Sequence, residues 1–411
     1  MRIPELLIPV GGPELLSTAL AFGADAVYLG SEALSLRARA DNFSLEDLQE
    51  ALAQTHRLNR KLYLTVNIFA REGDLAQGIE LFQQLAAWEE KPDGLIISDP
   101  GLIALSRQFC PDIPLHLSTQ ANTTNSESLR FWYGQGIRRA VLARELSLGE
   151  IQAINEHTPE DLELELFVHG SMCMSYSGRC LISSFLTGRD ANRGDCAQPC
   201  RWSYALMEER RPGQYMPVEE TERGTYLFNS RDLCMIDHLP ELIRACAACL
   251  KVEGRMKNEL YVATVTRAYR RALDALSKSE DAYRAILPWC REELLKITTR
   301  EYCTGFYFGP PGEAGQKPKS SVYRQDYRYL GRIREDERGL YIRQKNKFSA
   351  GNLLEAIGPG DRTLSFTVRA FETEGGEIKY DCPHPGEKLY LHTDAVLHIN
   401  DIIREKKHES D

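Results

Sequence analysis

The chain of 411 residues is 43% hydrophobic and 27% charged, the balance of an ordinary globular protein with room for two or three domains. Its net charge of −9 argues mildly against nucleic acid as a partner, and no apolar run reaches the roughly 18 residues of a membrane span. The N-terminal apolar stretch is too short for a signal peptide, so we expect a cytoplasmic protein with no membrane partner and with reduced cysteines.

From residue 1 to about residue 170, short apolar strands alternate with amphipathic helical segments. An eighth strand, at residues 249–253, comes only after a cysteine-rich segment and leads into another helical segment. Eight strand-then-helix units predict an α/β fold, a (β/α)8 barrel of the TIM type, rather than an open sheet. The first seven strands are predicted at residues 5–10, 26–30, 61–67, 94–99, 114–120, 140–143 and 162–169.

Polar residues close many of these strands, at the end of a barrel where enzymes place their chemistry. Because barrel interiors are packed with branched apolar side chains, we expect these polar groups to face the mouth. For any one of them a helix cap or a loop hydrogen bond is an equally good explanation, and Asp99 and Asn122 are typical of helix caps. The residues are Asn67, Ser98, Gln120, Asn122, Arg144, Glu145, His169, Glu253 and Arg255.

Five cysteines lie within 62 residues, in a segment rich in Gly, Ser, Asp and Arg that we predict to be an insertion at about residues 170–235. Such surroundings stabilise thiolates. The paired knuckles typical of structural zinc are missing, whereas an iron–sulfur cluster tolerates looser spacing. Spacing alone therefore leaves an iron–sulfur cluster, a zinc ion and a redox or inert set open. The cysteines are Cys173, Cys180, Cys196, Cys200 and Cys234.

Beyond the barrel, which we place at residues 1–285, we predict a helix and linker at residues 286–325 and a small antiparallel β-barrel at residues 326–405. Between Lys317 and Lys347 there are ten Lys/Arg and four Asp/Glu, a charge of 10 − 4 = +6, and tyrosines are interleaved with them. Cations for phosphates and aromatic faces for bases predict RNA binding. The alternative is a solvated hairpin whose cations protect an edge strand.

Several long motifs resemble the collagenase-like peptidases of family U32, almost from end to end of the chain. The cysteine segment FVHGSMCMSYSGRCLISSFLTGRDANRGDCAQPCRW resembles the family's signature, and the likeness includes PELLIPVGGPELLSTALAFGADAVYLG, LKVEGRMKNELYVATVTRAYRRALD and YCTGFYFG. The C-terminal β-domain makes the chain most similar to the family's prephenate-dependent tRNA uridine hydroxylases. A peptidase is the alternative, although no HExxH motif is present.

The resemblance implies a 4Fe–4S cluster on four cysteines, which match Cys173, Cys180, Cys196 and Cys234 here, with Cys200 as a reserve ligand. It also implies hydroxylation of wobble uridine 34 of tRNA to 5-hydroxyuridine, with prephenate as the hydroxyl donor. Other family members imply two alternatives: hydroxylation of a 23S rRNA cytidine, and work in a pair with a second family member.

Prephenate is a dicarboxylate, and guanidinium groups bind carboxylates bidentately. The arginines best placed for this binding are Arg37, Arg39, Arg144 and Arg255, which follow predicted strands. Each of them is also a candidate for a structural ion pair, for example Arg255 with Glu253.

Overall fold

The computed structural model describes residues 2–31, 34–35, 42–173, 175–177, 179–191, 195–202, 205–207, 215–217, 231–310 and 325–407. The chain forms two compact units. The first, which we call the barrel unit, comprises residues 1–13, 25–256 and 300–323. The second, which we call the sheet unit, comprises residues 14–24, 257–299 and 324–411.

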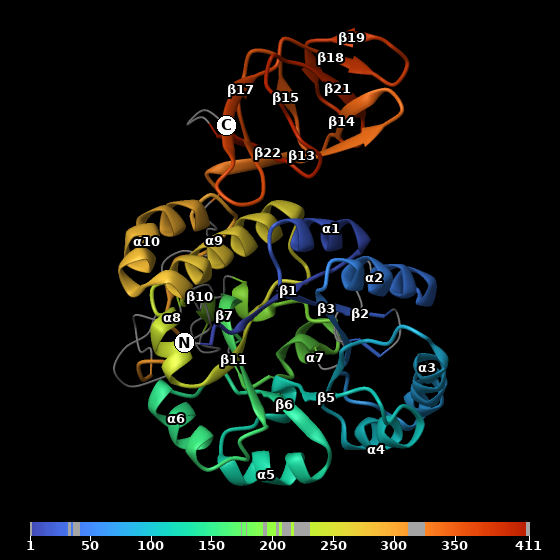
Figure 1. Ribbon diagram of the computed structural model, residues 1–411, viewed down its shortest axis with the longest axis vertical. Coiled ribbons are helices and arrows are strands. Elements are labelled where there is room, and N and C mark those ends of the chain that lie inside the picture. Colours follow the sequence, from blue (N-terminus) through green and yellow to red (C-terminus); the bar gives the residue numbers. More distant parts are fainter. Residues whose placement is uncertain are drawn as a thin grey trace. The chain divides into compact units, whose positions relative to one another are not determined.

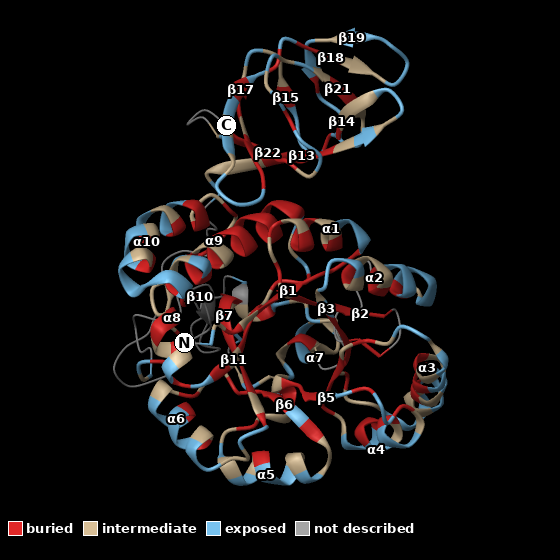
Figure 2. Ribbon diagram, in the orientation of Figure 1, coloured by how far each residue is buried: buried red, intermediate tan, exposed pale blue. Residues whose placement is uncertain are grey.

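Eight parallel strands close into the predicted barrel, because β11 pairs with both β1 and β7. The strands form the ring in Figure 1, and Figure 2 shows that this ring is buried almost throughout. All eight predicted strands are present, although the sixth begins at Ile137, earlier than the pattern indicated. Their bounds are β1 Glu5–Pro9, β2 Ala26–Gly30, β3 Lys61–Val66, β4 Gly94–Ile97, β5 Leu115–Leu117, β6 Ile137–Val141, β7 Glu163–Ser171 and β11 Ala247–Val252.

Helices follow the strands of the barrel unit, and side-chain caps mark where several of them begin. Asp99 accepts a hydrogen bond from the backbone N–H of Leu102 and caps α4, as predicted. Asn122 instead closes the short 3₁₀ helix η2, and the N-cap of α5 is Asn125. The helices are α2 Leu45–Arg57, η1 Glu72–Asp74, α3 Leu75–Ala87, α4 Pro100–Phe109, η2 Thr119–Ala121, α5 Ser126–Gly134, α6 Leu148–Glu156, α7 Ile182–Thr187, η4 Pro199–Arg201 and α8 Leu239–Arg244.

The barrel sheet continues beyond the ring at the end of β7. Strand β10 (Asp232–Cys234) runs antiparallel to the last residues of β7, and β12 (Tyr302–Cys303) pairs in parallel with β10. A separate antiparallel pair, β8 (Ala205–Met207) and β9 (Tyr215–Pro217), lies within the insertion. The extension holds the end of the cysteine-rich segment against the carboxyl end of the barrel.

The interior of the barrel near the amino ends of the strands holds a buried ionic network. The Arg139 guanidinium, 4% exposed, donates to Glu163 at 2.6 and 2.8 Å and to Glu5 at 2.7 Å. The Lys251 ammonium donates to the fully buried Glu165 at 2.6 Å. Burial alone would raise the pKa of Glu5, but Arg139 and Lys61 outweigh it and hold that pKa below its ordinary value.

The sheet unit combines three helices with a small all-antiparallel β-structure, which confirms the predicted β-domain. Its main sheet has the order β17-β16-β22-β13-β14-β21-β18-β19, and β15 pairs with β20. The helices are α1 Pro13–Ala21, α9 Glu259–Lys278 and α10 Glu280–Leu294. The strands are β13 Tyr327–Asp336, β14 Gly339–Arg343, β15 Phe348–Ser349, β16 Leu353–Ile357, β17 Thr363–Thr367, β18 Ala370–Thr373, β19 Ile378–Lys379, β20 Asp381–Cys382, β21 Lys388–His392 and β22 Ile402–Lys406.

Buried ion pairs explain why α9 and α10 belong to the same compact unit as the β-strands. Arg404 of β22 donates to both oxygens of Glu293 at 2.9 Å, and Arg267 of α9 lies 3.4 Å from the same carboxylate. Arg267 also donates to the backbone oxygens of Gly360 and Arg362. Breaking a buried pair of this kind costs about 3–5 kcal/mol. The sequence-based boundary at residue 285 stays a prediction for the extent of the folding domains.

Candidate functional site at the carboxyl end of the barrel

One of the four candidate arginines, Arg255, is held inside the mouth by side chains of neighbouring strands. Its Nη1 donates to Ser35 Oγ at 2.7 Å and to Thr65 Oγ1 at 2.9 Å, and only 5% of the residue is exposed. Gly30 leaves the space for this guanidinium, because a Cβ there would overlap Arg255 Nη1 and Ser35 Oγ. Ser35 and Thr65 therefore fix the Arg255 guanidinium, and Glu253 pairs with Arg144. The predicted role of Arg255 in binding a dicarboxylate stays a prediction.

Arg144 lies beside the cysteine-rich segment and follows β6. Its guanidinium stacks 4.0 Å from the Phe167 ring, and Nη1 donates to the backbone oxygen of Ser171 at 3.0 Å. The same nitrogen lies 3.8 Å from Cys173 Sγ, and Nη2 lies 3.4 Å from Glu253. Its buried Nε has no hydrogen-bond partner among the described residues. Arg144 thus retains a free guanidinium donor.

Next to it, Glu145 is a half-buried carboxyl at the same end of the barrel. Burial raises the pKa of Glu145 above its ordinary value, against the opposing effects of its own backbone N–H and of the Arg144 charge. A carboxyl with a raised pKa beside a guanidinium is suited to exchanging a proton with a bound molecule.

The other two candidate arginines, Arg37 and Arg39, lie outside the described residues. Their predicted role in binding a dicarboxylate stays a prediction.

Two of the predicted cluster ligands, Cys173 and Cys234, lie along the extension of β7. Cys234 is paired with His169, and Cys173 comes two residues after the end of β7. The His169 ring lies 5.2 Å from the Tyr302 ring. The antiparallel return of β10 therefore brings together cysteines that are 61 positions apart in the sequence.

Cys180, Cys196 and the reserve ligand Cys200 lie around α7 and η4. Cys180 precedes α7, Cys200 lies within η4, and the backbone N–H of Gln198 donates to Cys196 Sγ at 3.3 Å. Asp190, just beyond α7, pairs with Arg71 in the loop after β3 at 3.3 Å. Strands β3 and β7 are far apart around the ring, so the insertion crosses the mouth of the barrel.

The donor chemistry of these cysteines fits an iron–sulfur cluster, because none of the five forms a disulfide and none is fully buried. A guanidinium faces one sulfur and a backbone N–H another, the donors that stabilise metal-bound thiolates. Among the described residues, no three His, Cys, Asp or Glu side chains gather as a ready-made metal site. The choice of ligands stays a prediction.

Two cysteines outside the predicted set deserve comparison with it. Cys303, on β12, lies beside Leu233 of β10, close in sequence to Cys234. Burial raises the pKa of the Cys303 thiol, which is typical of a structural cysteine. Cys246 is exposed, whereas Cys249, three residues later on β11, is buried. Cys246 follows the end of α8 and has a φ of 62°, outside the helical range.

In the sheet unit, most cations of the described part of the basic stretch are already paired. Arg332 is 8% exposed and lies 3.1 Å from Glu259, while Arg328 lies 3.1 Å from Glu405. Tyr329 is buried and donates its hydroxyl to Glu259. These side chains stabilise the fold and are poorly placed to contact phosphates or bases.

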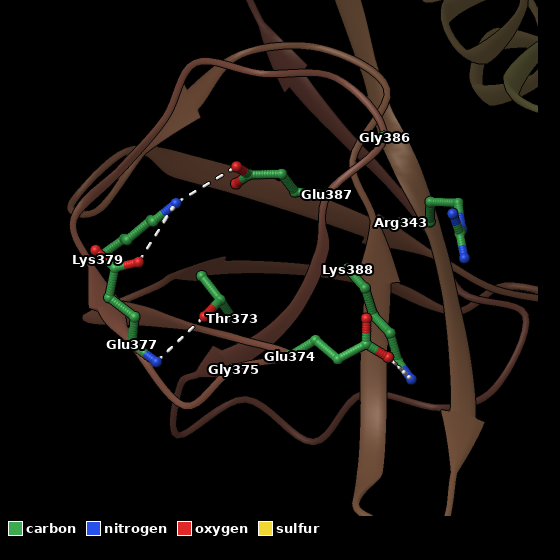
Figure 3. Close-up of a pocket in the computed structure, with 9 residues that line it drawn as sticks. All are labelled: Arg343, Thr373, Glu374, Gly375, Glu377, Lys379, Gly386, Glu387 and Lys388. Atoms are coloured by element: carbon green, nitrogen blue, oxygen red, sulfur yellow. Dashed lines mark hydrogen bonds and ion pairs between the residues drawn. The ribbon is translucent and has the colours of Figure 1, made fainter.

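A shallow cavity of about 360 Å³ lies over the strands of the sheet unit (Figure 3). Lys379 lies between Glu377 and Glu387, and Lys388 lies beside Glu374. The exposed Arg343 guanidinium makes no hydrogen bond or ion pair with any described side chain. Arg343 is therefore a cation of the basic stretch that remains available. The cavity is lined by Arg343, Thr373, Glu374, Gly375, Glu377, Lys379, Gly386, Glu387 and Lys388.

The fold and the cysteine-rich mouth agree with what family comparison finds. The model of Peptidase family U32 matches residues 11–317, and the model of the Peptidase family U32 C-terminal domain matches residues 325–404. The chain belongs to Peptidase family U32. No helix among the described residues is both long and apolar enough to cross a membrane.

Three relatives show how far the likeness extends. A tRNA hydroxylation protein of Bacillus subtilis is 34% identical over 98% of this chain and 95% of its own length. A tRNA hydroxylation protein of Escherichia coli is 35% identical over 97% of this chain and 95% of its own length. A 23S rRNA 5-hydroxycytidine synthase of Escherichia coli is 37% identical over 66% of this chain but only 39% of its own length.

Proposed function

We propose that the chain is an RNA hydroxylase that acts on tRNA and replaces the hydrogen at carbon 5 of wobble uridine 34 with a hydroxyl group. The observation that carries this proposal is the likeness to two tRNA hydroxylation proteins over nearly the full length of all three chains. The likeness to the rRNA enzyme spans a smaller part of both proteins, so tRNA is the better-supported substrate.

We propose a 4Fe–4S cluster as the cofactor, held by Cys173, Cys180, Cys196 and Cys234, with Cys200 as the reserve ligand. Side chains alone cannot carry the oxidation of a ring carbon, and such a cluster would supply electron transfer when bound. Arg144 would orient the Cys173 sulfur through its Nη1. The insertion, which crosses the mouth, would limit the access of water to the reacting groups.

We propose prephenate as the donor of the hydroxyl group and Arg144 as a residue that binds one of its carboxylates. The Nε of Arg144 is buried and unpaired, and its aromatic and backbone contacts fix the plane of the guanidinium. Arg255 is less suited to this role because it is more deeply buried than Arg144, with only 5% of the residue exposed. Glu145, with its raised pKa, would exchange a proton with the substrate.

The test of the reaction is mass spectrometry of tRNA and rRNA nucleosides from a strain that lacks the gene. We expect loss of 5-hydroxyuridine from tRNA, restoration by the wild-type gene, and unchanged rRNA. Loss of a hydroxycytidine from rRNA would instead favour the second candidate function. Normal nucleosides in both RNAs, together with cleavage of a denatured protein by the purified chain, would favour the peptidase. Normal tRNA in cells that cannot make prephenate would contradict only the assigned donor.

The cofactor is tested by iron and sulfide analysis of protein purified without oxygen. We expect Cys173→Ala, Cys180→Ala, Cys196→Ala and Cys234→Ala to lose both elements. Cys246→Ala is the matched control, since Cys246 is an exposed thiol outside the proposed set. Tightly bound zinc without sulfide would contradict the cluster, and loss in Cys200→Ala but not in Cys196→Ala would exchange these two ligands.

We also propose that the sheet unit contacts RNA through Arg343 and its neighbours. Reversal of Arg343 to Glu should weaken tRNA binding and reduce its dependence on salt, because one phosphate contact is lost. Arg332→Glu is an unsuitable probe, since it would place a carboxylate beside the buried Glu259. Unchanged salt dependence in the Arg343 variant would contradict this contact.

A further inference from the structure

The loop after β5 contains buried polar side chains that bind nothing in the described part of the chain. Gln120 is 4% exposed, and its amide makes no hydrogen bond with a described residue; Oε1 is fully shielded. Thr123 is 1% exposed, and its hydroxyl is equally without a partner. Asn122 Oδ1 is a third such atom, in a loop of only a few residues. Buried polar groups in native proteins are nearly always hydrogen-bonded, so this concentration requires an explanation.

The backbone of this loop is firmly held on both sides. The Ser118 N–H donates to Ile97 at 2.7 Å, and the Ala143 N–H donates to Thr123 at 3.2 Å. Asn122, at a φ of 54°, donates its side-chain amide to the backbone oxygen of Gln120 at 2.7 Å. The loop therefore has a defined conformation, fixed between the carboxyl ends of β4 and β6.

The unpaired loop atoms lie at the same end of the barrel as the unpaired nitrogen of Arg144. The backbone oxygen of Thr123 accepts a hydrogen bond from the N–H of Ala143, the residue directly before Arg144. The Nε of Arg144 also lacks a partner. By contrast, Arg255, Ser35 and Thr65 at this end of the barrel bind one another. Four of the atoms without hydrogen-bond partners at this end, in Gln120, Asn122, Thr123 and Arg144, thus lie on the β5–β6 side of the mouth, and Asn42 Oδ1 in the loop after β2 is a further such atom.

A structural role does not account for Gln120. A side chain that forms no hydrogen bond in the fold loses its contacts with water on burial and gains none in return. An apolar residue of the same size would fill the space at lower cost. The amide gains partners only from an internal water or from a molecule that enters the mouth.

The side-chain chemistry defines the kind of partner. A glutamine amide presents one acceptor beside donors in one plane, and it pairs bidentately with a planar ring that offers a complementary donor and acceptor. Uracil offers a ring N–H next to carbonyl oxygens. We propose that Gln120, with Thr123 beside it, binds the base-pairing edge of the pyrimidine that the enzyme modifies. This proposal rests on the proposed function and extends it to the selection of the base.

Such recognition requires that the nucleotide leave the stack of its neighbours and enter the mouth. Enzymes that modify bases read the extruded base through its base-pairing edge. Unpaired nucleotides of an RNA loop are the least costly to extrude, and sequence-specific RNA recognition usually targets them.

The experiment measures binding of an RNA stem-loop to the full-length protein by fluorescence anisotropy. The target position of the stem-loop carries uridine, cytidine or no base. Gln120→Met removes the hydrogen-bonding groups and keeps the size of the side chain. Gln120→Glu retains only acceptors when ionised, and these suit the amino group of cytosine. Gln108→Met is the control for the chemical change, because Gln108 is exposed on α4.

We expect wild-type protein and the Gln108 variant to prefer the uridine stem-loop over the abasic one by about 10- to 100-fold, the range of a good bidentate pair. Gln120→Met should lose this preference while its melting temperature stays the same or rises. Gln120→Glu should shift the preference toward cytidine. A structural side chain would show the opposite pattern, a lower melting temperature with retained preference.

The results separate this inference from the proposed function. If Gln120→Met distinguishes uridine from the abasic site as well as wild type does, the unpaired amide binds only internal water and the inference is wrong. It is also wrong if wild-type protein does not distinguish them. If wild type shows the preference and Gln120→Met loses it, but no tRNA nucleoside changes in the deletion strain, base recognition stands and the proposed reaction fails.

Discussion

The two ends of the barrel differ in how fully their buried polar groups are paired. Near the amino ends of the strands, Arg139 binds both Glu5 and Glu163. Lys251 binds Glu165 in the same network, in which Glu165 Oε2 and His116 Nδ1 lack hydrogen-bond partners among the described residues. Near the carboxyl ends, Gln120, Thr123 and Arg144 carry buried atoms without partners. Paired charges tie strands together, whereas unpaired groups lower stability and leave hydrogen bonds available to a ligand. The charge network therefore holds most of its buried groups in ion pairs, whereas the β5–β6 side of the carboxyl end leaves several polar atoms unpaired.

The largest effect is expected from breaking the paired end. Arg139→Leu leaves the largely buried Glu5 carboxylate without its main cation and also removes the partner of the part-exposed Glu163. Loss of one partner from a buried pair costs about 3–5 kcal/mol. Urea denaturation followed by circular dichroism measures the loss. The control is Arg138→Leu, an exposed neighbour on the same strand. A loss below about 1 kcal/mol would mean that the network contributes little to stability.

Glu5 at one end of the barrel and Glu145 at the other should make stability depend on pH in opposite directions. The pKa of Glu5 is lowered in the folded protein. Its contribution to the free energy of unfolding is therefore complete above the unfolded pKa near 4.5 and is lost as the pH falls through the lower folded pKa. The pKa of Glu145 is raised in the folded protein. Its contribution to the free energy of unfolding is therefore complete below the unfolded pKa near 4.5 and is lost as the pH rises through the higher folded pKa.

Denaturation curves of Glu5→Gln and Glu145→Gln between pH 3 and pH 7 test these signs. Relative to wild type, Glu5→Gln should be least stable at neutral pH and recover in acid. Glu145→Gln should be least stable in acid. Parallel curves for wild type and both variants would contradict the assigned environments.

A smaller loss of stability is expected from removing the Thr65 hydroxyl, which is hydrogen-bonded to Arg255 at the carboxyl end of the barrel. Thr65 Oγ1 donates to the backbone oxygen of Leu29 at 3.0 Å and accepts from Arg255 at 2.9 Å. Thr65→Val keeps the shape but removes an acceptor from a buried guanidinium, which should cost about 1–3 kcal/mol. The same denaturation assay measures it, and a neutral result would show that water replaces the hydroxyl.

The smallest effect is expected from the matching substitution at the unpaired loop. Thr123→Val removes a buried hydroxyl that has no partner, so stability should change by less than about 0.5 kcal/mol or increase. A loss of stability as large as that of Thr65→Val would mean that the Thr123 hydroxyl has a partner. The paired Thr65 and the unpaired Thr123 would then no longer differ.

The sequence predicted those features that depend on local pattern. Each barrel strand is a short apolar run closed by polar residues, so the eight strands and the order of the fold could be recognised. Residues 326–405 showed period-two alternation, and the antiparallel β-structure confirms that interpretation. Asp99 was recognisable as a cap because Pro100 follows it directly.

Features that depend on distant partners could not be predicted. Glu5 and Arg139 are 134 positions apart, and Arg332 pairs with Glu259 on a helix that precedes the β-domain. The sequence therefore indicated more unpaired cations in the basic stretch than the structure contains. Gln120 was recognised only as one polar residue at a strand end, because a missing partner is visible only when every neighbour is known.

The closure of the ring by β11 has a consequence for synthesis of the chain. Strand β11 pairs with both β1 and β7, yet it lies beyond the whole insertion. While the ribosome adds residues 172–246, β1 and β7 both have unpaired edges, and open strand edges recruit other chains. Release of a fragment that ends before Ala247 should therefore yield aggregates rather than a smaller stable barrel. Translation through this interval is the period in which a chaperone would be most useful to the nascent chain.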